Sequence, residues 1–103
     1  MDTTITGRHV TISDSLREYA LSKANKLPHF YDRVNRVEII ADRHDSHSYR
    51  VEFVAHVDGH AHFVAHAHHD DLYAATDACS EKLIRQIHDY KAQRRDAKKH
   101  SPV

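Results

Sequence analysis

Residues 49–68 read YRVEFVAHVDGHAHFVAHAH, with an apolar side chain at every second position on both sides of Asp58-Gly59. An alternation of period two is typical of a strand that buries one face and exposes the other. The Asp-Gly pair favours a hairpin turn, because glycine tolerates the positive φ that such turns need. The stretch therefore predicts two neighbouring antiparallel strands that share one apolar face.

The length of the hairpin loop follows from that face, because directly paired residues point to the same side of a sheet. A two-residue loop would pair Val57 with His60 and would mix apolar with polar positions. A three-residue loop over residues 58–60 keeps one face apolar, and the pairs that it predicts are Val57 with Ala61, Ala55 with Phe63 and Phe53 with Ala65. We therefore expect the three-residue loop.

Two further strands are indicated upstream of the hairpin. Val37, Ile39 and Ala41 occupy alternate positions, which predicts another half-buried strand. Residues 3–12 are rich in β-branched side chains and predict a first strand, in which Gly7 permits a bend or a bulge. The chain thus contains sequence for four strands.

A helix is predicted between the first two strands. Ser13 can cap it, and apolar side chains recur at helical spacing from Leu16 to Leu27. Pro28 ends the pattern, because a proline disfavours helical backbone at the residue before it. The sequence therefore predicts a helix over about residues 14–27.

A second, longer helix is predicted after the hairpin. Asp70 or Asp71 can cap it, and its apolar stripe comprises Leu72, Ala75, Cys79, Leu83, Ile87 and Tyr90. We expect this helix to run to about residue 93 or beyond. Residues 96–103 have no apolar stripe to hold them, so they predict a flexible tail after a single domain of residues 1–95.

The resulting order of elements is β-α-β-β-β-α. A helix between the first two strands fits a parallel pair with a right-handed crossover, and the later strands fit an antiparallel meander. Each helix has one apolar stripe, and each strand has one apolar face. We predict an α+β two-layer sandwich, in which both helices cover one face of a four-stranded sheet.

Composition limits the classes of protein to which the chain can belong. Its 103 residues fit one ordinary globular domain, and its apolar runs are too short to span a bilayer, so we expect a cytoplasmic protein. The single cysteine, Cys79, cannot form an intramolecular disulfide or a multi-cysteine zinc site. Its place on the apolar stripe predicts a small core residue.

The charges cancel overall but are unevenly distributed. Residues 1–36 contain six basic and four acidic side chains, residues 37–71 contain two and seven, and residues 72–103 contain seven and four. The three segments therefore have net charges of +2, −5 and +3. If the outer segments are mainly helical and the middle segment is sheet, the molecule has a basic side and an acidic side.

Short motifs along residues 4–91 resemble those of one protein family. They include Ile5-Thr6-Gly7, Leu16-Arg17-Glu18, Lys26-Leu27, Asp32-Arg33, Asp71-Leu72-Tyr73-Ala74-Ala75 and Lys82-Leu83 with Arg85-Gln86. Together they resemble the pattern of the ribosome hibernation-promoting factors, also called the ribosome-associated inhibitor or sigma-54 modulation family. The resemblance extends over nearly the whole predicted domain, and the chain looks like a short form that lacks an extra C-terminal domain.

The resemblance implies a fold similar to double-stranded-RNA-binding domains. It also implies binding to the small ribosomal subunit and its ribosomal RNA, in the channel that messenger and transfer RNA otherwise occupy. There the protein would block translation and preserve idle, dimeric ribosomes in stationary phase. A ribosome modulation factor on the same ribosome is a further implied partner, whereas no membrane and no small-molecule substrate are expected.

Cations on the two helices are the candidate contacts to RNA, since closely spaced phosphates require positive side chains on a rigid frame. The candidate RNA-binding residues are Lys23, Lys26, Tyr73, Lys82, Arg85, Gln86 and Lys91. For Lys23 the alternative is a packed stem with its ammonium group reaching water. Tyr73 is as readily explained by partial packing, and Lys91 by the dipole at a helix C-terminus.

The histidines support a different hypothesis. His62, His66 and His68 share one face of the fourth strand, His60 lies at its loop end, and His56 is opposite His62. Imidazoles at such spacing can bind zinc, cobalt, nickel or copper, but a flat exposed sheet provides no closed cage. We expect adventitious metal binding only, and a His-rich transition-metal-binding protein is the alternative function.

Catalytic motifs are not apparent in the sequence. It contains no nucleophile elbow, no phosphate-binding glycine loop and no paired carboxylate motif, and Gly7 and Gly59 are its only glycines. We therefore expect no enzymatic activity and no cofactor. Binding of free double-stranded RNA, or a role in transcription, is a third hypothesis that rests on fold similarity and on the older family name alone.

Overall fold

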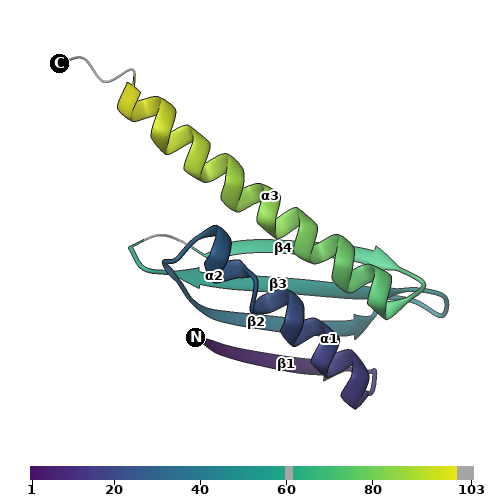
Figure 1. Ribbon diagram of the computed structural model, residues 1–103. Helices are drawn as coiled ribbons and strands as arrows, with labels where there is room; N and C mark the ends of the chain where they lie inside the picture. The colour runs from purple at the N-terminus through teal and green to yellow at the C-terminus, as the bar shows by residue number, and fades with distance from the viewer. Residues whose placement is uncertain (60–61, 100–103) are drawn as a thin grey trace.

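The computed structural model describes residues 1–59 and 62–99 of the chain. Its elements, shown in Figure 1, are β1 (Asp2–Arg8), α1 (Asp14–Ala24), α2 (Leu27–Phe30), β2 (Val34–Arg43), β3 (Tyr49–Val57), β4 (Phe63–His69) and α3 (Leu72–Lys99). The strands form one sheet in the order β1-β2-β3-β4. β1 and β2 are parallel, and the other neighbouring pairs are antiparallel.

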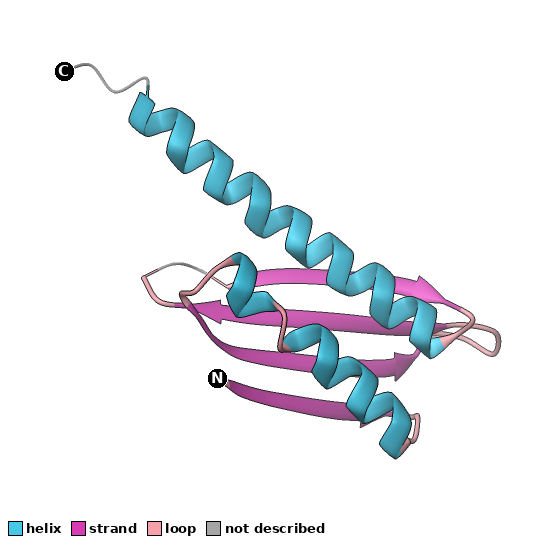
Figure 2. Ribbon diagram, viewed as in Figure 1, coloured by secondary structure: helices cyan, strands magenta, loops and turns pink. Residues whose placement is uncertain are grey.

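The helices α1, α2 and α3 lie on the same face of the sheet, as Figure 2 shows. This arrangement confirms the predicted two-layer α+β sandwich. The core between the layers is formed by alternate strand residues such as Val37, Phe53 and Ala65, and by Leu83 and Ile87 of α3, all of which are buried. The period-two alternation of the strands therefore identifies the face that the helices cover.

The register of the hairpin confirms the predicted pairing. Ala55 lies opposite Phe63, and Phe53 lies opposite Ala65. Gly59 adopts a φ of 71°, a left-handed conformation that glycine accepts without strain. The third predicted pair, Val57 with Ala61, falls outside the described residues.

The first strand is shorter than predicted. β1 ends at Arg8 rather than extending to residue 12, because the chain turns sharply at His9, whose φ is 58°. A Cβ atom on Gly7 would lie 2.5 Å from the carbonyl oxygen of Val10, so this close return of the backbone requires glycine. Beyond the turn, the side chains of Val10 and Ile12 pack against the core without belonging to the strand.

The first predicted helix is two helices. Ser13 caps α1 as expected, and its Oγ accepts a 3.1 Å hydrogen bond from the backbone N–H of Leu16. The helix ends at Ala24, and α2 begins at Leu27 with Pro28 in its first turn. The prediction that Pro28 ends one continuous helix was therefore wrong in its boundary. Proline lacks an N–H, which is tolerated in a first turn, so it helps to start α2.

The long helix α3 begins as predicted. The Asp71 carboxylate accepts a 3.0 Å hydrogen bond from the backbone N–H of Tyr73. The helix has 28 residues and continues to Lys99, through positions that the sequence assigned to the tail. Its C-terminal half projects beyond the sheet in Figure 1, which lengthens the molecule to 56 × 25 × 17 Å. The flexibility of residues 96–103 stays a prediction, and residues 100–103 lie outside the described range.

Cys79 of α3 is a core residue, as its position on the stripe predicted. Its side chain is fully buried, and its Sγ donates to the carbonyl oxygen of Ala65 at 3.2 Å. Burial raises the pKa of the thiol to about 12. A thiol that stays protonated at neutral pH is a poor nucleophile. No described helix has both the length and the apolar content required to cross a bilayer.

Candidate nucleic-acid interface

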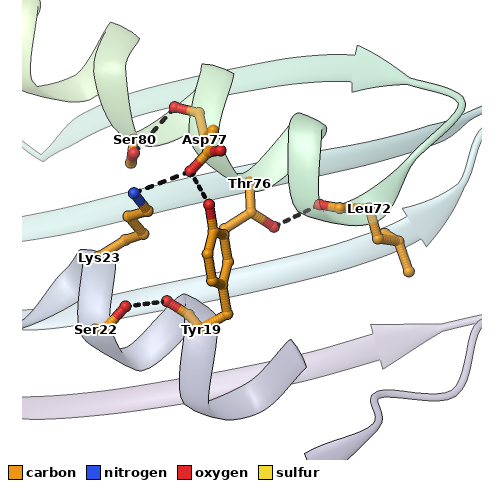
Figure 3. A network of polar contacts seen from close by, with 7 residues as sticks. All are labelled: Tyr19, Ser22, Lys23, Leu72, Thr76, Asp77 and Ser80. Atoms are coloured by element: carbon orange, nitrogen blue, oxygen red, sulfur yellow. Dashed lines mark hydrogen bonds and ion pairs between the residues drawn. The ribbon is translucent and has the colours of Figure 1, made fainter. Parts of the chain in front are cut away.

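A polar network joins α1 to α3 (Figure 3). The Tyr19 hydroxyl donates to Oδ1 of Asp77 at 2.5 Å, and the ammonium of Lys23 lies 3.0 Å from the same oxygen. The Lys23 ammonium is also 5.1 Å from the centroid of the Tyr19 ring, within range of a cation–π interaction. Two side chains of α1 thus converge on one carboxylate oxygen of α3.

The electrostatics of this network stabilise the charged forms of its ion pair. The hydrogen bond from Tyr19, together with Lys23, holds the pKa of Asp77 below its usual range. The hydrogen bond to Asp77 raises the pKa of Lys23 above its ordinary value. The same hydrogen bond raises the pKa of Tyr19, because ionisation of the phenol would remove the donor.

Two of the candidate residues therefore contribute to helix packing. The Lys23 side chain is 25% exposed and is paired with Asp77, so replacing it would disturb the α1–α3 contact as well as any contact to RNA. Tyr73 packs edge-on against Tyr19 at a centroid distance of 5.2 Å, and its hydroxyl is 3.0 Å from Oγ of Ser15. Its ring remains partly exposed and accessible at one side.

Two other candidates contact the outer strand of the sheet. The ammonium of Lys82 donates to the carbonyl oxygen of His66 at 3.1 Å, and the amide of Gln86 donates to that of Val64 at 2.8 Å. Both carbonyls belong to β4, an edge strand of the sheet. An ammonium has three donors and a primary amide has two, so each side chain keeps at least one donor for another partner.

Lys91 connects α3 to α2. Its ammonium donates to the carbonyl oxygen of Phe30, the last residue of α2, at 2.7 Å. The same group lies 6.0 Å from the centroid of the Tyr31 ring. Lys91 thus satisfies a carbonyl at the end of a short helix, which is a structural use of the cation.

Lys26 and Arg85 are the candidates with uncommitted charges. Both residues are exposed, and neither side chain makes a hydrogen bond or an ion pair with any residue that the structure describes. Lys26 lies between α1 and α2, and Arg85 lies on α3. Since neither cation is hydrogen-bonded or ion-paired within the described residues, both can contact phosphate without breaking such an interaction.

The candidate residues occupy two flanks of α3. Lys23 approaches Asp77 from the α1 side, whereas Lys82 and Gln86 reach the outer edge of β4. The candidate residues thus border a helical side that extends across α1 and α3.

The histidines form a separate group on the opposite face of the sheet. The rings of His56 and His62 are 3.9 Å apart between centroids, as the predicted opposition implies. Within residues 1–59 and 62–99, however, no three or more His, Cys, Asp or Glu side chains are placed to hold a metal ion. His60 lies outside these ranges. The metal-binding alternative, which also involved His66 and His68, thus receives no support from the geometry.

Sequence reasoning missed the partners that organise the helical side. Asp77 and Tyr19 are 58 positions apart, and the link between Ser15 and Tyr73 also joins the two helices over 58 positions. Asp77 does stand beside the apolar stripe of α3, which marks it as a residue near the helix interface. No local pattern identifies which residue of another element it meets.

The structure is thus a small α+β domain, in which helices with exposed cations cover one face of a four-stranded sheet. Residues 3–95 match the family described as sigma 54 modulation protein / S30EA ribosomal protein, and the chain belongs to this family. The family resemblance predicted from the motifs is confirmed.

Two relatives illustrate how much of the chain is shared. The ribosome hibernation promoting factor of Azotobacter vinelandii is 36% identical over 87 residues, which cover 84% of this chain and 79% of the relative. The protein of the same name from Escherichia coli strain K12 is 34% identical over 91 residues, which cover 88% and 94% of the two chains.

Solved structures have the same fold. A ribosomal subunit interface protein from Coxiella burnetii superposes with a TM-score of 0.81 and 29% identity, covering 89% of this chain and 99% of that one. The N-terminal domain of Protein Y from Thermus thermophilus superposes with a TM-score of 0.75 and 23% identity, covering 84% and 94%. The second similarity concerns the fold alone.

Proposed function

We propose that this protein is a ribosome hibernation factor. It binds the small ribosomal subunit through ribosomal RNA, in the channel of messenger and transfer RNA, and thereby stops translation and preserves idle ribosomes in stationary phase. It acts in the cytoplasm by occupying a site, without catalysis. Dimeric ribosomes, and a modulation factor bound beside it, belong to the same proposal.

The names of the relatives support this proposal. Proteins at least 34% identical over most of the chain are called ribosome hibernation promoting factors. The protein from Coxiella burnetii is called a ribosomal subunit interface protein. The phosphates of ribosomal RNA attract cations that are held on a rigid surface, as the candidate cations of α1 and α3 are.

The single observation that carries the proposal is the pair of exposed cations, Lys26 and Arg85. Lys26 lies in a motif that matches the family, and so does Arg85. Both are free of hydrogen bonds and ion pairs to the described residues, so their contacts to phosphate cost no internal interaction. Lys82 and Gln86 stand on the same helix as Arg85 with donors to spare, and Lys23, Tyr73 and Lys91 contribute less because they are engaged in packing.

Neutralising this pair tests the proposal. The double variant Lys26→Gln, Arg85→Gln should fold normally and bind purified small subunits at least about tenfold more weakly, since one lost charge-assisted hydrogen bond costs about 1.5 to 3 kcal/mol. Cosedimentation at neutral pH measures the binding, and thermal unfolding verifies the fold.

The matched control is Arg36→Gln, Arg50→Gln, which removes the same charge from the opposite face of the sheet. Binding of this control should stay near the wild-type level. An equal loss in both variants would mean that only total charge matters, and a loss in the control alone would place the interface on the sheet face.

A further inference from the structure

The face of the sheet that the helices leave uncovered has an unusual set of side chains. The register places 15 residues on it in four rows, which are Asp2-Arg36-His56, Thr4-Glu38-Val54-Val64, Thr6-Ile40-Glu52-His66 and Arg8-Asp42-Arg50-His68. His62, which precedes β4, extends the first row, because its ring lies against that of His56. We call this surface the open face. On this face β4 contributes Val64, His66 and His68, and His62 lies just before the strand.

At neutral pH the open face is close to electrically neutral. Its three arginines are outnumbered by four carboxylates, which leaves one net negative charge when the imidazoles are neutral. Two of the arginines are paired, Arg36 with Glu38 at 2.9 Å and Arg50 with Glu52 at 3.6 Å. Such a surface has little attraction for a polyanion.

The imidazoles are concentrated at one side of this face. His56 and His62 have ring centroids 3.9 Å apart, and His66 and His68 have centroids 5.8 Å apart. His44, from the connection between β2 and β3, lies 4.3 Å from His68. Protonation of all five rings would change the net charge of the face from −1 to +4.

Charged groups from every neighbouring element affect this protonation. Glu38 of β2 lies 3.5 Å from Nε2 of His56, an atom that is buried and has no hydrogen-bond partner among the described residues. Protonation of Nε2 would allow His56 to donate a hydrogen bond to the carboxylate of Glu38. The other charged groups around the imidazoles are Arg36 and Asp42 of β2, Arg50 and Glu52 of β3, Lys82 of α3, Asp2 and Arg8 of β1, His9, which is 3.2 Å from Asp42, and Asp45 beside His44.

The surroundings of His68 favour its neutral form at neutral pH. Partial desolvation, and then the positive groups His44, Arg50, His66 and Lys82, hold the pKa of His68 below its usual range.

We propose that the open face is a second RNA-binding surface, which binds single-stranded RNA when its imidazoles are protonated. It lies opposite the helical side, so it is independent of the proposed ribosome interface. A flat four-stranded sheet suits unpaired bases, because imidazole and guanidinium planes can stack on them. Val54 and the 43% exposed Val64 form an apolar strip between the rows of cations. Imidazolium and arginine groups then meet the phosphates.

The binding of a labelled single-stranded oligouridylate to the full chain tests this proposal. Fluorescence anisotropy is measured at about pH 5.5 and about pH 7.5, on either side of the ordinary imidazole pKa of about 6.5. The wild-type protein should bind at least about tenfold more tightly at the lower pH, and its salt dependence should be steeper there by about two units of log–log slope if three more phosphates are neutralised.

Three variants separate the open face from general charge. The triple variant His62→Gln, His66→Gln, His68→Gln should reduce the acid-induced gain to less than about twofold. His62→Arg, His66→Arg, His68→Arg should bind tightly at both pH values, because its charges are permanent. The control His29→Gln, His88→Gln removes exposed histidines of the helical side and should keep the full gain.

Several outcomes would overturn the proposal. One is a full acid-induced gain in affinity in the glutamine triple variant, and another is a loss of that gain in the His29→Gln, His88→Gln control. A third is a loss of the gain in the Lys26→Gln, Arg85→Gln variant, which would assign the acid-induced binding to the helices. Equally tight binding of polyglutamate would show a surface for any polyanion. Thermal unfolding at both pH values verifies that each variant is folded. None of these results tests the proposed binding to the ribosome at neutral pH, which is measured separately by cosedimentation.

Discussion

Asp77 is the residue of α3 that receives both polar contacts from Tyr19 and Lys23 of α1. Its Oδ1 accepts the Tyr19 hydrogen bond at 2.5 Å and pairs with Lys23 at 3.0 Å. The carboxylate is 40% exposed, so water screens much of this attraction and the network stabilises the fold only modestly. The network also links the two helices that provide the candidate cations.

We predict that Asp77→Asn lowers the free energy of unfolding at neutral pH by about 0.5 to 1 kcal/mol. Because the pKa of Asp77 is depressed in the folded state, its contribution is complete above the ordinary aspartate value of about 3.9 and is lost as the pH falls through the folded-state pKa. Urea unfolding of both proteins from about pH 7 to about pH 3 measures the difference.

Asp89→Asn is the control for this experiment. Asp89 is exposed on the same helix, and its side chain makes no hydrogen bond or ion pair within the described ranges. The two asparagine variants should therefore differ in stability at neutral pH and converge in acid. A constant difference between wild type and Asp77→Asn at every pH would contradict the assigned role.

At the scale of elements, β4 is the strand that most needs protection. It forms an edge of the sheet, and edge strands expose backbone groups that can pair with another chain. Lys82 and Gln86 of α3 donate to two of its carbonyls, those of His66 and Val64. The long helix thus covers one edge of the sheet with polar side chains.

Removal of the Lys82 and Gln86 side chains should expose the backbone of β4. The double variant Lys82→Ala, Gln86→Ala should lower stability by about 1 kcal/mol, since two exposed hydrogen bonds are lost, and should increase concentration-dependent self-association. Glu81→Ala, Arg85→Ala changes two exposed residues of the same helix that do not contact β4, and should leave both properties unchanged. Sedimentation velocity and thermal unfolding compare the two variants. Equal stability and equal self-association of the two variants would contradict a protective role of Lys82 and Gln86.

The whole molecule is a two-sided body with no net charge. The exposed flanks of the helices provide cations on one side, and the open face on the other side is nearly neutral at pH 7. A polyanion is therefore attracted by the distribution of charge and not by its total. Under the proposed function, the same distribution would turn the helices toward phosphate and the open face away from it.

Because the attraction is electrostatic, binding to the small subunit should weaken steeply with salt. Neutralisation of three or four phosphates predicts a slope of about −3 in a plot of log affinity against log salt concentration. Cosedimentation between about 50 and about 200 mM salt, at constant magnesium, measures this slope. A flat response would show that the interface is held by contacts other than ion pairs.

The sequence by itself determined the architecture and the family. Period-two alternation identified the buried face of β3 and β4, and the same pattern selected the three-residue loop, because a shift by one residue would turn every side chain to the wrong face. The stripe of α3 predicted that Cys79 lies in the core. The motifs along residues 4–91, among them those that contain Lys26 and Arg85, predicted the family. All of these are local properties, which a linear pattern can express.

Only the tertiary structure decided which cations are engaged and where some elements end. Lys91 bonds to Phe30 over 61 positions, and Lys23 meets a carboxylate on another helix. A long flexible side chain has no preferred partner until packing brings one within reach, so periodicity could not separate these lysines from Lys26. The end of β1 likewise depends on the Val10 carbonyl returning to within 2.5 Å of a Cβ position on Gly7, a close approach that exists only in the folded chain.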